Sequence, residues 1–291
     1  MTTAGVLVLV GTPLGNRGDL SPRAREAILT ADLLLCEDTR SPIRLLGDEV
    51  QLPPRISCFV ANEGDRIGLL LEHLGRGARV AYVSEAGLPV WSDPGLRLVE
   101  AAVAAGYAVD VVPGPTAAAV ALCLSGLPSE DVRFLGFLPR SGPERAEKFA
   151  AIKDETATVL LYEAGNRTPA LLADLARALP DAATRRVVIG RELTKQHQEV
   201  LRGTVMELAA SVDEALRGEV TVVLAGTAAV KSAEDPAQVA ARGVWQLMTD
   251  RALRPRERAK AIAALTGLDA REIYEQLARL NKTPSDPEPA A

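Results

Sequence analysis

The sequence predicts an α/β protein that ends in an all-helical segment. Short runs rich in valine and leucine alternate with stretches whose apolar residues recur at helical spacing. Several of the helical stretches begin with a side-chain oxygen followed by proline, a common helix start. Between Gln238 and Leu280 the pattern is helical only. Strands alternating with helices, then helices alone, are typical of an α/β region followed by a separate helical domain.

Eight short runs are expected to form strands, because each is rich in β-branched residues or leucine and is bounded by turn residues. They are residues 6–10, 33–36, 80–83, 108–112, 133–136, 159–162, 187–189 and 220–225. All are far shorter than the roughly 20 apolar residues that a helix needs to cross a bilayer. The N-terminus also lacks a basic region followed by a long apolar core. We therefore expect neither membrane insertion nor secretion.

Three expected helices share one start signal. Ser21, Asp93 and Thr168 each precede a proline, which places a capping oxygen before a residue whose φ suits the first helical turn. In the helical segment near the C-terminus, Asp269 and Glu272 of DARE predict a capping box. A short helix, a glycine turn and this last helix together predict a helix–turn–helix.

The segment PGPTAAAVALCLSGLP predicts the boundary between two α/β domains. It combines a rigid turn, a helix of small residues and a second glycine–proline stop. A small polar stretch later predicts a linker, and the last residues have the composition of a disordered chain. The predicted organisation is an N-terminal α/β domain (1–117), a C-terminal α/β domain (118–228), a basic helical domain (229–283) and a disordered tail (284–291).

Charge and cysteine content limit the function classes. The formal net charge is −5, which argues against a protein whose whole surface coats nucleic acid. The charge is uneven, because basic residues outnumber acidic ones in residues 241–282. Cys36, Cys58 and Cys123 are far apart and only two histidines accompany them, so neither a disulfide framework nor a metal site is predicted. We expect a cytoplasmic protein.

Acidic side chains follow several of the expected strands. EDTR places Glu37 and Asp38 directly after residues 33–36, Glu63 follows the run ISCFV, and Glu163 follows VLLY. Ligands of α/β sheets bind at the carboxyl ends of the strands. Each acid taken alone is better explained by a helix cap or by surface charge than by a ligand site. Their repetition at strand ends favours a ligand site.

The loop VSEAGLPVWSDPG, residues 83–95, has two glycines, two prolines and two acids after an expected strand. Glycine lets backbone approach a ligand closely, and proline stiffens the loop and removes N–H donors. The sequence has no GxxxxGK[ST] phosphate loop, no GxSxG elbow and no GxGxxG turn. The first expected strand is followed instead by GTPLGN, a loop with proline at its centre.

Six segments together resemble one family: GTPLGN (11–16), EDTR (37–40), VSEAGLPVWSDPG (83–95), VVPGPTAA (111–118), LLYEAGNR (160–167) and GRELTK (190–195). By their order and spacing, residues 5–226 resemble the tetrapyrrole-methylase superfamily, which has a two-domain class III methyltransferase fold. The chain is most similar to the ribosomal RNA small-subunit methyltransferase I group, because tetrapyrrole enzymes do not share GRELTKQHQEVLRGT in this form. The basic helical segment resembles the group's C-terminal helix–turn–helix domain. The chain departs from the group's usual residues at Ala61, Leu88 and Trp91.

The resemblance implies that S-adenosylmethionine binds in a cleft between two α/β domains. It further implies methylation of the ribose 2′-oxygen of a cytidine in the decoding region of 16S rRNA, within the 30S subunit, by a homodimer. The cofactor-binding residues that it implies are Pro13, Glu85, Ala86, Gly87, Leu88, Thr116, Ala117, Glu163 and Thr194.

Methyl transfer to a hydroxyl requires a base that takes the proton, and a carboxylate at a strand end is the available type. Glu37 and Asp38 of EDTR are the expected catalytic residues, with Glu63 as the alternative. Arg40 or Lys195 is expected to hold RNA phosphate.

The basic helical segment has two interpretations. Arg254, Arg256, Arg258 and Lys260 are expected to bind rRNA phosphates, which would position the enzyme without supplying sequence choice. Alternatively, these side chains form a solvated helix face.

Two other functions fit the same residues. One is methylation of a tetrapyrrole or another small acceptor, because the cofactor loops are shared across the superfamily. The other is a nucleic-acid-binding regulator without catalysis. The intact cofactor loops favour an enzyme, and the basic helical segment and low aromatic content favour RNA.

Overall fold

The computed structural model describes residues 5–212, 214–227, 243–245, 247–248 and 253–280. The chain divides into two compact units, Met1–Ala228 and Ala229–Ala291. The predicted disordered tail at 284–291 lies outside the described residues. Among the residues that are described, no helix is both long enough and apolar enough to cross a membrane.

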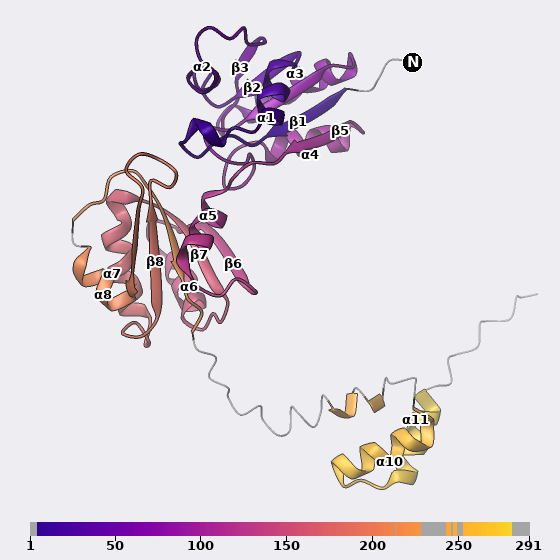
Figure 1. Cartoon of the computed structure of the whole chain (residues 1–291). Coiled ribbons are helices and arrows are strands. Elements are labelled where there is room, and N and C mark those ends of the chain that lie inside the picture. The colour runs from indigo at the N-terminus through magenta and orange to yellow at the C-terminus, as the bar shows by residue number, and fades with distance from the viewer. Residues whose placement is uncertain (1–4, 213, 228–242, 246, 249–252, 281–291) are drawn as a thin grey trace, which may run out of the picture. The chain divides into compact units, whose positions relative to one another are not determined.

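The first part of the N-terminal unit is a parallel five-stranded sheet with the order β3-β2-β4-β1-β5. Its strands are β1 (Val6–Val10), β2 (Leu33–Cys36), β3 (Arg55–Ser57), β4 (Arg79–Val83) and β5 (Ala108–Val112). The connecting helices are the short η1 (Arg17–Asp19), α1 (Pro22–Leu29), α2 (Ser41–Leu46), α3 (Glu63–Gly75) and α4 (Leu96–Ala104) (Figure 1). Because all five strands are parallel, the loops after β1, β2 and β4 emerge at one edge of the sheet.

Both faces of this sheet are covered by helices. Val8 of β1 packs with Ile28 of α1 on one face, and Leu7 packs with Leu70 of α3 and Leu98 of α4 on the other. Successive side chains of a strand point to opposite faces, so a strand covered on both sides reads as a continuous apolar run. This explains why β1 and β2 were visible in the sequence as short runs of valine and leucine.

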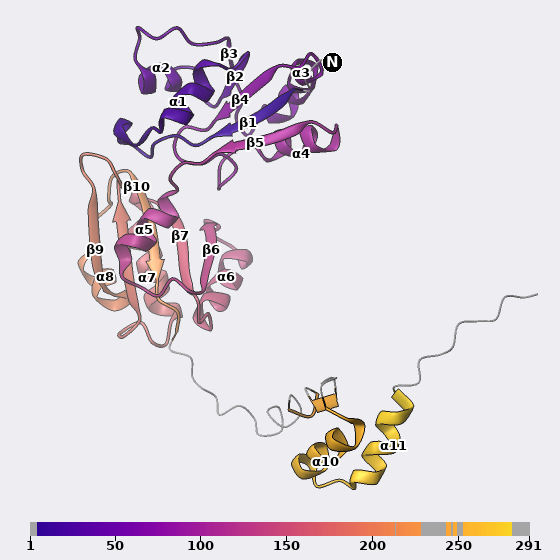
Figure 2. The ribbon, with the colours of Figure 1, turned by 45° about the vertical axis from the view of Figure 1, so that its right-hand side comes forward.

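The second part of the unit is a mixed sheet with the order β6-β7-β10-β8-β9. β6 and β7 are parallel, and the remaining neighbours are antiparallel. Its strands are β6 (Val132–Phe137), β7 (Thr158–Ala164), β8 (Arg186–Arg191), β9 (Glu199–Thr204) and β10 (Glu219–Leu224). Its helices are α5 (Ala117–Ser125), α6 (Pro143–Lys153), the short η2 (Gly165–Arg167), α7 (Thr168–Ala178) and α8 (Val205–Ser211) (Figure 2).

Helix α5 lies alone on one face of the second sheet. Ala118 and Ala121 of α5 pack with Leu160 of β7, whereas Leu161 faces the opposite core together with Leu171 of α7. Small side chains on α5 let the helix pack closely against the strands. The helix within the predicted boundary segment 113–128 is therefore part of the second core.

All eight predicted strands are present, and two further strands were missed. β3 has three residues and carries an arginine and a serine, so it offers no apolar run. β9 is an edge strand and is only partly buried, and its sequence EVLRGT shows neither a strict polar–apolar alternation nor a long apolar run. Both strands form because a neighbouring strand pairs with them.

One of the predicted helix starts is confirmed and two are corrected. The Ser21 side chain accepts a hydrogen bond from the Ala24 amide at the start of α1 (3.1 Å). The predicted cap at Asp93 is wrong, because α4 begins at Leu96 and its N-cap is Gly95. Thr168 is the first residue of α7 rather than its cap.

The described part of the C-terminal unit is helical. α10 (Pro255–Thr266) and α11 (Ala270–Leu280) are joined by a turn in which Gly267 has a φ of 72°, a conformation that favours glycine. The Asp269 carboxylate accepts hydrogen bonds from the amides of Arg271 (2.8 Å) and Glu272 (3.1 Å), as the predicted cap requires. Ala259, Ile262 and Leu277 form the small buried core between the helices.

Candidate active site

A cavity of about 430 Å³ lies where loops of the first sheet meet the second sheet. The structure brings seven of the nine predicted cofactor residues to its wall: Glu85, Ala86, Gly87, Leu88, Thr116, Ala117 and Glu163. They come from the loop after β4, from the start of α5 and from the end of β7. The position of this cavity, at the carboxyl ends of parallel strands, is where α/β sheets bind ligands.

Two loops of the first sheet are tied together beside the cavity. The Thr12 amide donates to the Gly87 carbonyl (2.8 Å), and the Gly87 amide donates to the Thr12 carbonyl (3.1 Å). Gly87 has a φ of 81°, and a Cβ at this position would lie 3.2 Å from the Pro115 carbonyl oxygen. A side chain at Gly87 would therefore be strained and crowded. The glycine therefore forms part of the cavity wall without a side chain that would project into it.

The loop after β4 is strained where it reaches the second sheet. Val90 and Ser92 have φ values of 73° and 60°, which are costly for side chains other than glycine, above all for β-branched valine. Between them, Trp91 stacks on Phe134 of β6 with ring centroids 4.9 Å apart. This contact joins the two sheets across the cavity. The strained turn is therefore held by packing against the other half of the unit.

The second sheet supplies the opposite wall. The Tyr162 hydroxyl accepts a hydrogen bond from the Ala118 amide at the start of α5 (3.2 Å). The neighbouring Glu163 is buried and forms an ion pair with Arg167. Its Oε1 accepts from Arg167 Nε at 2.6 Å. Glu163 is thus a fixed carboxylate at the edge of the cavity.

The cavity is lined by acidic groups. Besides Glu85 and Glu163 it contains Glu37, Asp93 and Glu219. Burial raises the pKa of Glu37. Burial, together with the charges of Glu37, Glu219 and Glu85, raises the pKa of Asp93 to about 6. A site with this charge suits a small organic cation, because each ionised carboxylate attracts it.

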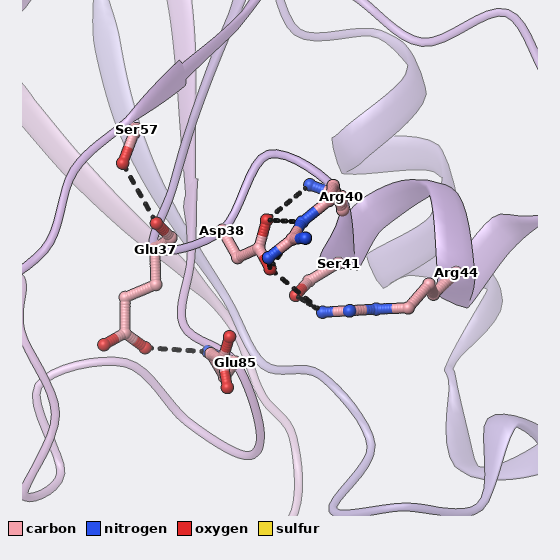
Figure 3. A network of polar contacts seen from close by, with 7 residues as sticks. All are labelled: Glu37, Asp38, Arg40, Ser41, Arg44, Ser57 and Glu85. Atoms are coloured by element: carbon pink, nitrogen blue, oxygen red, sulfur yellow. Dashed lines mark hydrogen bonds and ion pairs between the residues drawn. The ribbon is translucent and has the colours of Figure 1, made fainter.

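The two acids of EDTR have different surroundings (Figure 3). Glu37 extends toward the loop after β4, and its Oε2 accepts a hydrogen bond from the Glu85 amide (3.0 Å). Asp38 turns to Arg40 and Arg44, to which it is bonded at 2.9 and 3.3 Å. Hydrogen bonds from Arg40 lower the pKa of Asp38 to about 2. Glu37 lines the cavity, whereas Asp38 fixes the turn between β2 and α2.

The Glu63 side chain has a structural role. It is buried, and its Oε1 accepts hydrogen bonds from the backbone amides of Gly95 (3.0 Å), Arg97 (2.9 Å) and Leu98 (3.4 Å). These amides belong to the N-terminus of α4, where a negative charge is favoured. Glu63 therefore supplies the cap that the sequence assigned to Asp93, and it does not face the cavity.

Three of the predicted residues lie beside the cavity wall. Pro13 precedes Leu14, which lines the cavity. The Thr194 hydroxyl accepts a hydrogen bond from the Asn16 amide (3.3 Å), which links the loop after β1 to the loop after β8. The Lys195 ammonium is bonded to Glu192 (3.0 Å) and Glu219 (2.8 Å), so two carboxylates already pair with it.

The four predicted RNA-binding residues of the C-terminal unit differ in exposure. Arg254, Arg256 and Lys260 are exposed, and the Arg256 guanidinium lies 5.9 Å from the Tyr274 ring centroid. The prediction that Arg258 binds RNA phosphate is wrong, because its side chain is buried and Nη1 donates to the Met248 carbonyl (3.0 Å). A guanidinium used inside the helical core cannot bind phosphate.

Several cavity residues were missed in the sequence. Trp91 and Asp93 were within the singled-out loop, and Tyr162 within LLYEAGNR, but none was assigned to the binding site, and Asp93 was expected only to cap a helix. Phe137 and the start of β10 were not considered, because nothing local marks them as neighbours of the loop after β4. Phe137 reaches the cavity through the pairing of β6 with β7, and the start of β10 through the pairing of β10 with β7. Among the described residues, no group of three or more histidine, cysteine, aspartate or glutamate side chains could hold a metal ion.

Comparisons with known proteins agree with this architecture. The family model of Tetrapyrrole (Corrin/Porphyrin) Methylases matches residues 6–209. A protein of Mycobacterium bovis named Ribosomal RNA small subunit methyltransferase I is 43% identical over 228 residues, 78% of this chain and 79% of that protein. A protein of the same name from Xylella fastidiosa is 38% identical over 278 residues, 94% of this chain and 99% of that protein.

A solved structure shows the same fold at low identity. It is uroporphyrin-III C-methyltransferase from Thermus thermophilus complexed with S-adenyl homocysteine, with a TM-score of 0.52 and 18% identity over 75% of this chain and 91% of that one. The predicted fold class and the predicted family resemblance are confirmed. The chain therefore belongs to the Tetrapyrrole (Corrin/Porphyrin) Methylases, in the group of proteins named Ribosomal RNA small subunit methyltransferase I.

Proposed function

We propose that this protein is a cytoplasmic S-adenosylmethionine-dependent methyltransferase of 16S rRNA. The acceptor that we propose is the ribose 2′-oxygen of a cytidine in the decoding region. The observation that carries this proposal is an acidic cavity at the strand ends of a chain that is 38% identical, over 94% of its length, to a ribosomal RNA small subunit methyltransferase. The same-named relatives support the RNA class of acceptor.

The cavity residues fit the cofactor. S-adenosylmethionine, when bound, supplies an electrophilic methyl group on a cationic sulfur that departs with the bonding electron pair. The carboxylates of the cavity favour this cation. Gly87, which has no side chain to fill the cavity, and the start of α5 at Thr116 and Ala117 would admit the adenosine part. Glu85, Ala86, Leu88 and Glu163 complete the proposed binding site, with Pro13 and Thr194 supporting it from the adjoining loops.

Glu37 is the proposed catalytic base. When the ribose oxygen bonds to the methyl carbon, its hydroxyl proton must pass to an acceptor, and the Glu37 carboxylate lies at the cavity wall. A raised pKa makes it a better proton acceptor than Asp38, whose pKa is held at about 2 by arginine. Glu63, which caps α4, is the less favoured alternative.

Basic side chains from both units of the chain are proposed to hold the RNA. Arg40 is 76% exposed although it pairs with Asp38, and such exposed pairs are weak enough to exchange for a phosphate. Arg254, Arg256 and Lys260 of α10 and its cap offer further exposed charges. Lys195 is a weaker candidate because two carboxylates pair with it. We propose that the acceptor is presented within the 30S subunit and that the enzyme acts as a homodimer.

One experiment tests this function. The protein is incubated with methyl-labelled S-adenosylmethionine and 30S subunits that lack the modification, and the label is then located. Label on a cytidine ribose of 16S rRNA is the expected result. Label found only on an added porphyrinoid would assign the enzyme to a small acceptor, and no label on any acceptor would indicate a regulator without catalysis.

A further inference from the structure

Aromatic residues gather at one place in this chain. Tryptophan, tyrosine and phenylalanine number 2, 4 and 4, which makes ten aromatic residues in all. Four of the ten, Trp91, Phe134, Phe137 and Tyr162, form one connected group beside the cavity. The Phe134 ring contacts Trp91 at 4.9 Å and Tyr162 at 5.0 Å between centroids, and Phe137 contacts Tyr162 at 5.5 Å.

Phe137 is more exposed than the other members of this group, of which Trp91 is 43% exposed. Phe137 ends β6 and is 58% exposed, whereas Phe134 and Tyr162 are only partly exposed. Its side chain lines the candidate active site and also a second, adjoining hollow of about 450 Å³. The underlying ring of Tyr162 is fixed by its hydrogen bond to the Ala118 amide. Phe137 is therefore an exposed aromatic ring that packs against a tyrosine held in place, at the boundary between two hollows.

The second hollow has an unpaired cation. Arg140 lines it, is exposed, and makes no ion pair or hydrogen bond with another described residue. Arg167 lines it too, but Glu163 neutralises that guanidinium. The segment that carries Arg140 is held in place, because Arg145 donates to the Pro139 carbonyl (2.8 Å).

A free guanidinium beside an exposed ring suits a nucleotide. Single-stranded RNA is recognised largely by bases that stack on aromatic side chains, and arginine binds phosphate through its planar array of donors. The hollow joins the acidic cavity at Phe137, so a nucleotide in the hollow could direct its ribose toward Glu37. Glu144 and Glu163 also line the hollow, where Arg140 and Arg167 balance them, whereas the acidic cavity has five carboxyl groups and no basic side chain in its wall. A phosphate is therefore favoured in the hollow over the cavity.

We propose that Phe137 is the stacking platform for a base of the single-stranded acceptor RNA and that Arg140 binds the adjacent phosphate. Both are positioning residues that place the acceptor ribose at the active site. The proposal rests on the function proposed above, because it names the subsite by which that RNA is held. It assigns the RNA contact to the second sheet, in addition to the basic residues of the C-terminal unit.

The test uses the full-length chain and four variants. Phe137→Leu keeps apolar volume without a ring, Phe137→Trp keeps an aromatic surface, and Arg140→Gln removes the free charge. Arg23→Gln, which removes an exposed arginine on α1, is the matched control. The readouts are kcat and KM with unmodified 30S subunits, calorimetric binding of S-adenosylhomocysteine, and the fluorescence of a short single-stranded RNA that carries pyrrolocytidine, a base quenched by stacking.

Phe137→Leu should raise the Kd for the RNA and the KM for 30S subunits about five- to a hundredfold and abolish the quenching, with S-adenosylhomocysteine binding unchanged. Phe137→Trp should restore the quenching. Arg140→Gln should weaken RNA binding and lower the slope of log K against log salt by about one, whereas Arg23→Gln should leave both unchanged.

Unchanged RNA binding and KM in Phe137→Leu, while the wild-type protein methylates rRNA, would overturn the stacking proposal and leave the proposed function intact. Failure of the wild-type protein to label rRNA would overturn both. A changed oligomeric state in light scattering, with RNA binding unaffected, would show that Phe137 covers a second copy of the chain and would also overturn the proposal.

Discussion

The side chain of Lys195 lies over Gly15, so that a Cβ on Gly15 would come within 2.2 Å of Lys195 Cγ. The two residues belong to loops of different sheets, and the nearby bond from the Asn16 amide to Thr194 joins the same loops. Lys195 in turn pairs with Glu219 at the cavity wall. A glycine in the first loop therefore leaves room for a lysine that connects the second loop to the active site.

Replacing Gly15 with alanine should weaken this connection. The added Cβ must displace the Lys195 stem, and we expect a loss of about 1 kcal/mol in the free energy of unfolding together with weaker binding of S-adenosylhomocysteine. Urea denaturation and calorimetry measure the two effects. The matched control is Gly68→Ala within α3, where a Cβ meets no atom within 4 Å. This control should stabilise the protein by about 0.5–1 kcal/mol, and an equal gain in Gly15→Ala would contradict the crowding.

Replacing Glu63 with alanine should destabilise the protein strongly. Three amides at the start of α4 lose a charged acceptor in a buried site, and we expect a loss of about 2–3 kcal/mol. Glu63→Gln retains an acceptor oxygen and should lie between the wild type and alanine. On the exposed side of α3, the helix that begins with Glu63, Glu72→Ala removes only a surface pair with Arg76 and should cost less than about 1 kcal/mol.

The activity of Glu63→Gln separates structure from catalysis. If Glu63 only caps α4, the folded variant keeps the wild-type kcat. Loss of turnover in a variant that is fully folded and binds S-adenosylhomocysteine normally would instead indicate that Glu63 is the catalytic base.

Asp93 should make stability depend on pH in a defined window. Its pKa is about 6 in the folded protein, against 3.8 for an ordinary aspartate, chiefly because of burial. Between pH 4 and 6 the unfolded chain ionises first, so the contribution of Asp93 to stability falls as the pH rises and is constant above that window. Asp93→Asn removes this term and should therefore gain stability relative to the wild type as the pH rises from 4 to 7.

Urea denaturation at several pH values measures this difference, with Asp65→Asn on the exposed side of α3 as the control. A wild-type and an Asp93→Asn protein whose stabilities run parallel between pH 4 and 7 would show that Asp93 is not held in the protonated form.

The basic residues of α10 should divide into two groups. Arg256→Gln and Lys260→Gln remove exposed charges and should each lower RNA affinity and reduce the salt slope by about one. Lys260→Gln should leave stability unchanged, and Arg256→Gln, which loses the contact with the Tyr274 ring, should cost less than about 1 kcal/mol. Arg258→Gln removes the buried donor to the Met248 carbonyl and should reduce the helical circular dichroism of the C-terminal unit on heating. Filter binding at several salt concentrations measures the first effect. Equal salt slopes for all three variants would refute the division.

The sequence was sufficient for features that depend on local pattern. β1 and β2 are buried on both faces and were visible as apolar runs, and the loops that follow them carry Leu14 and Glu37 to the cavity. Of the acids that follow expected strands, Glu37 and Glu163 line the cavity, whereas Asp38 and Glu63 do not. β3 was missed because three residues with arginine and serine show no such pattern.

Long-range packing determines the surroundings of the residues whose roles could not be predicted from the sequence. Glu63 follows an apolar run like Glu37, yet the fold brings the start of α4 onto its carboxylate and removes it from the site. Arg258 looks like its neighbours in a basic helix, but the partner helix buries it. Phe137 reaches the cavity because β6 pairs with β7 and Trp91 crosses from the other sheet. None of these relationships has a local signal.

Glu37→Gln is the decisive substitution for the chemistry. Loss of the proton acceptor should lower kcat about 10²- to 10⁴-fold with S-adenosylmethionine saturating. The amide oxygen of glutamine can still accept from the Glu85 amide, so the loop after β4 should keep its position and binding of S-adenosylhomocysteine, which lacks the sulfonium charge, should change little. Asp38→Asn is the paired control, because Asp38 fixes Arg40 and Arg44 rather than facing the cavity, and its kcat should stay within about threefold of the wild type.

The measurement is single-turnover methylation of unmodified 30S subunits, which separates the chemical step from product release. Because burial raises the pKa of Glu37, the wild-type rate should rise with pH through that pKa, and the residual rate of Glu37→Gln should lack this rise. Full turnover in both Glu37→Gln and Asp38→Asn would remove the carboxylate base from the segment after β2. Glu63 and Asp93, of which Asp93 faces the same cavity, would then be the next carboxylates to test as the base.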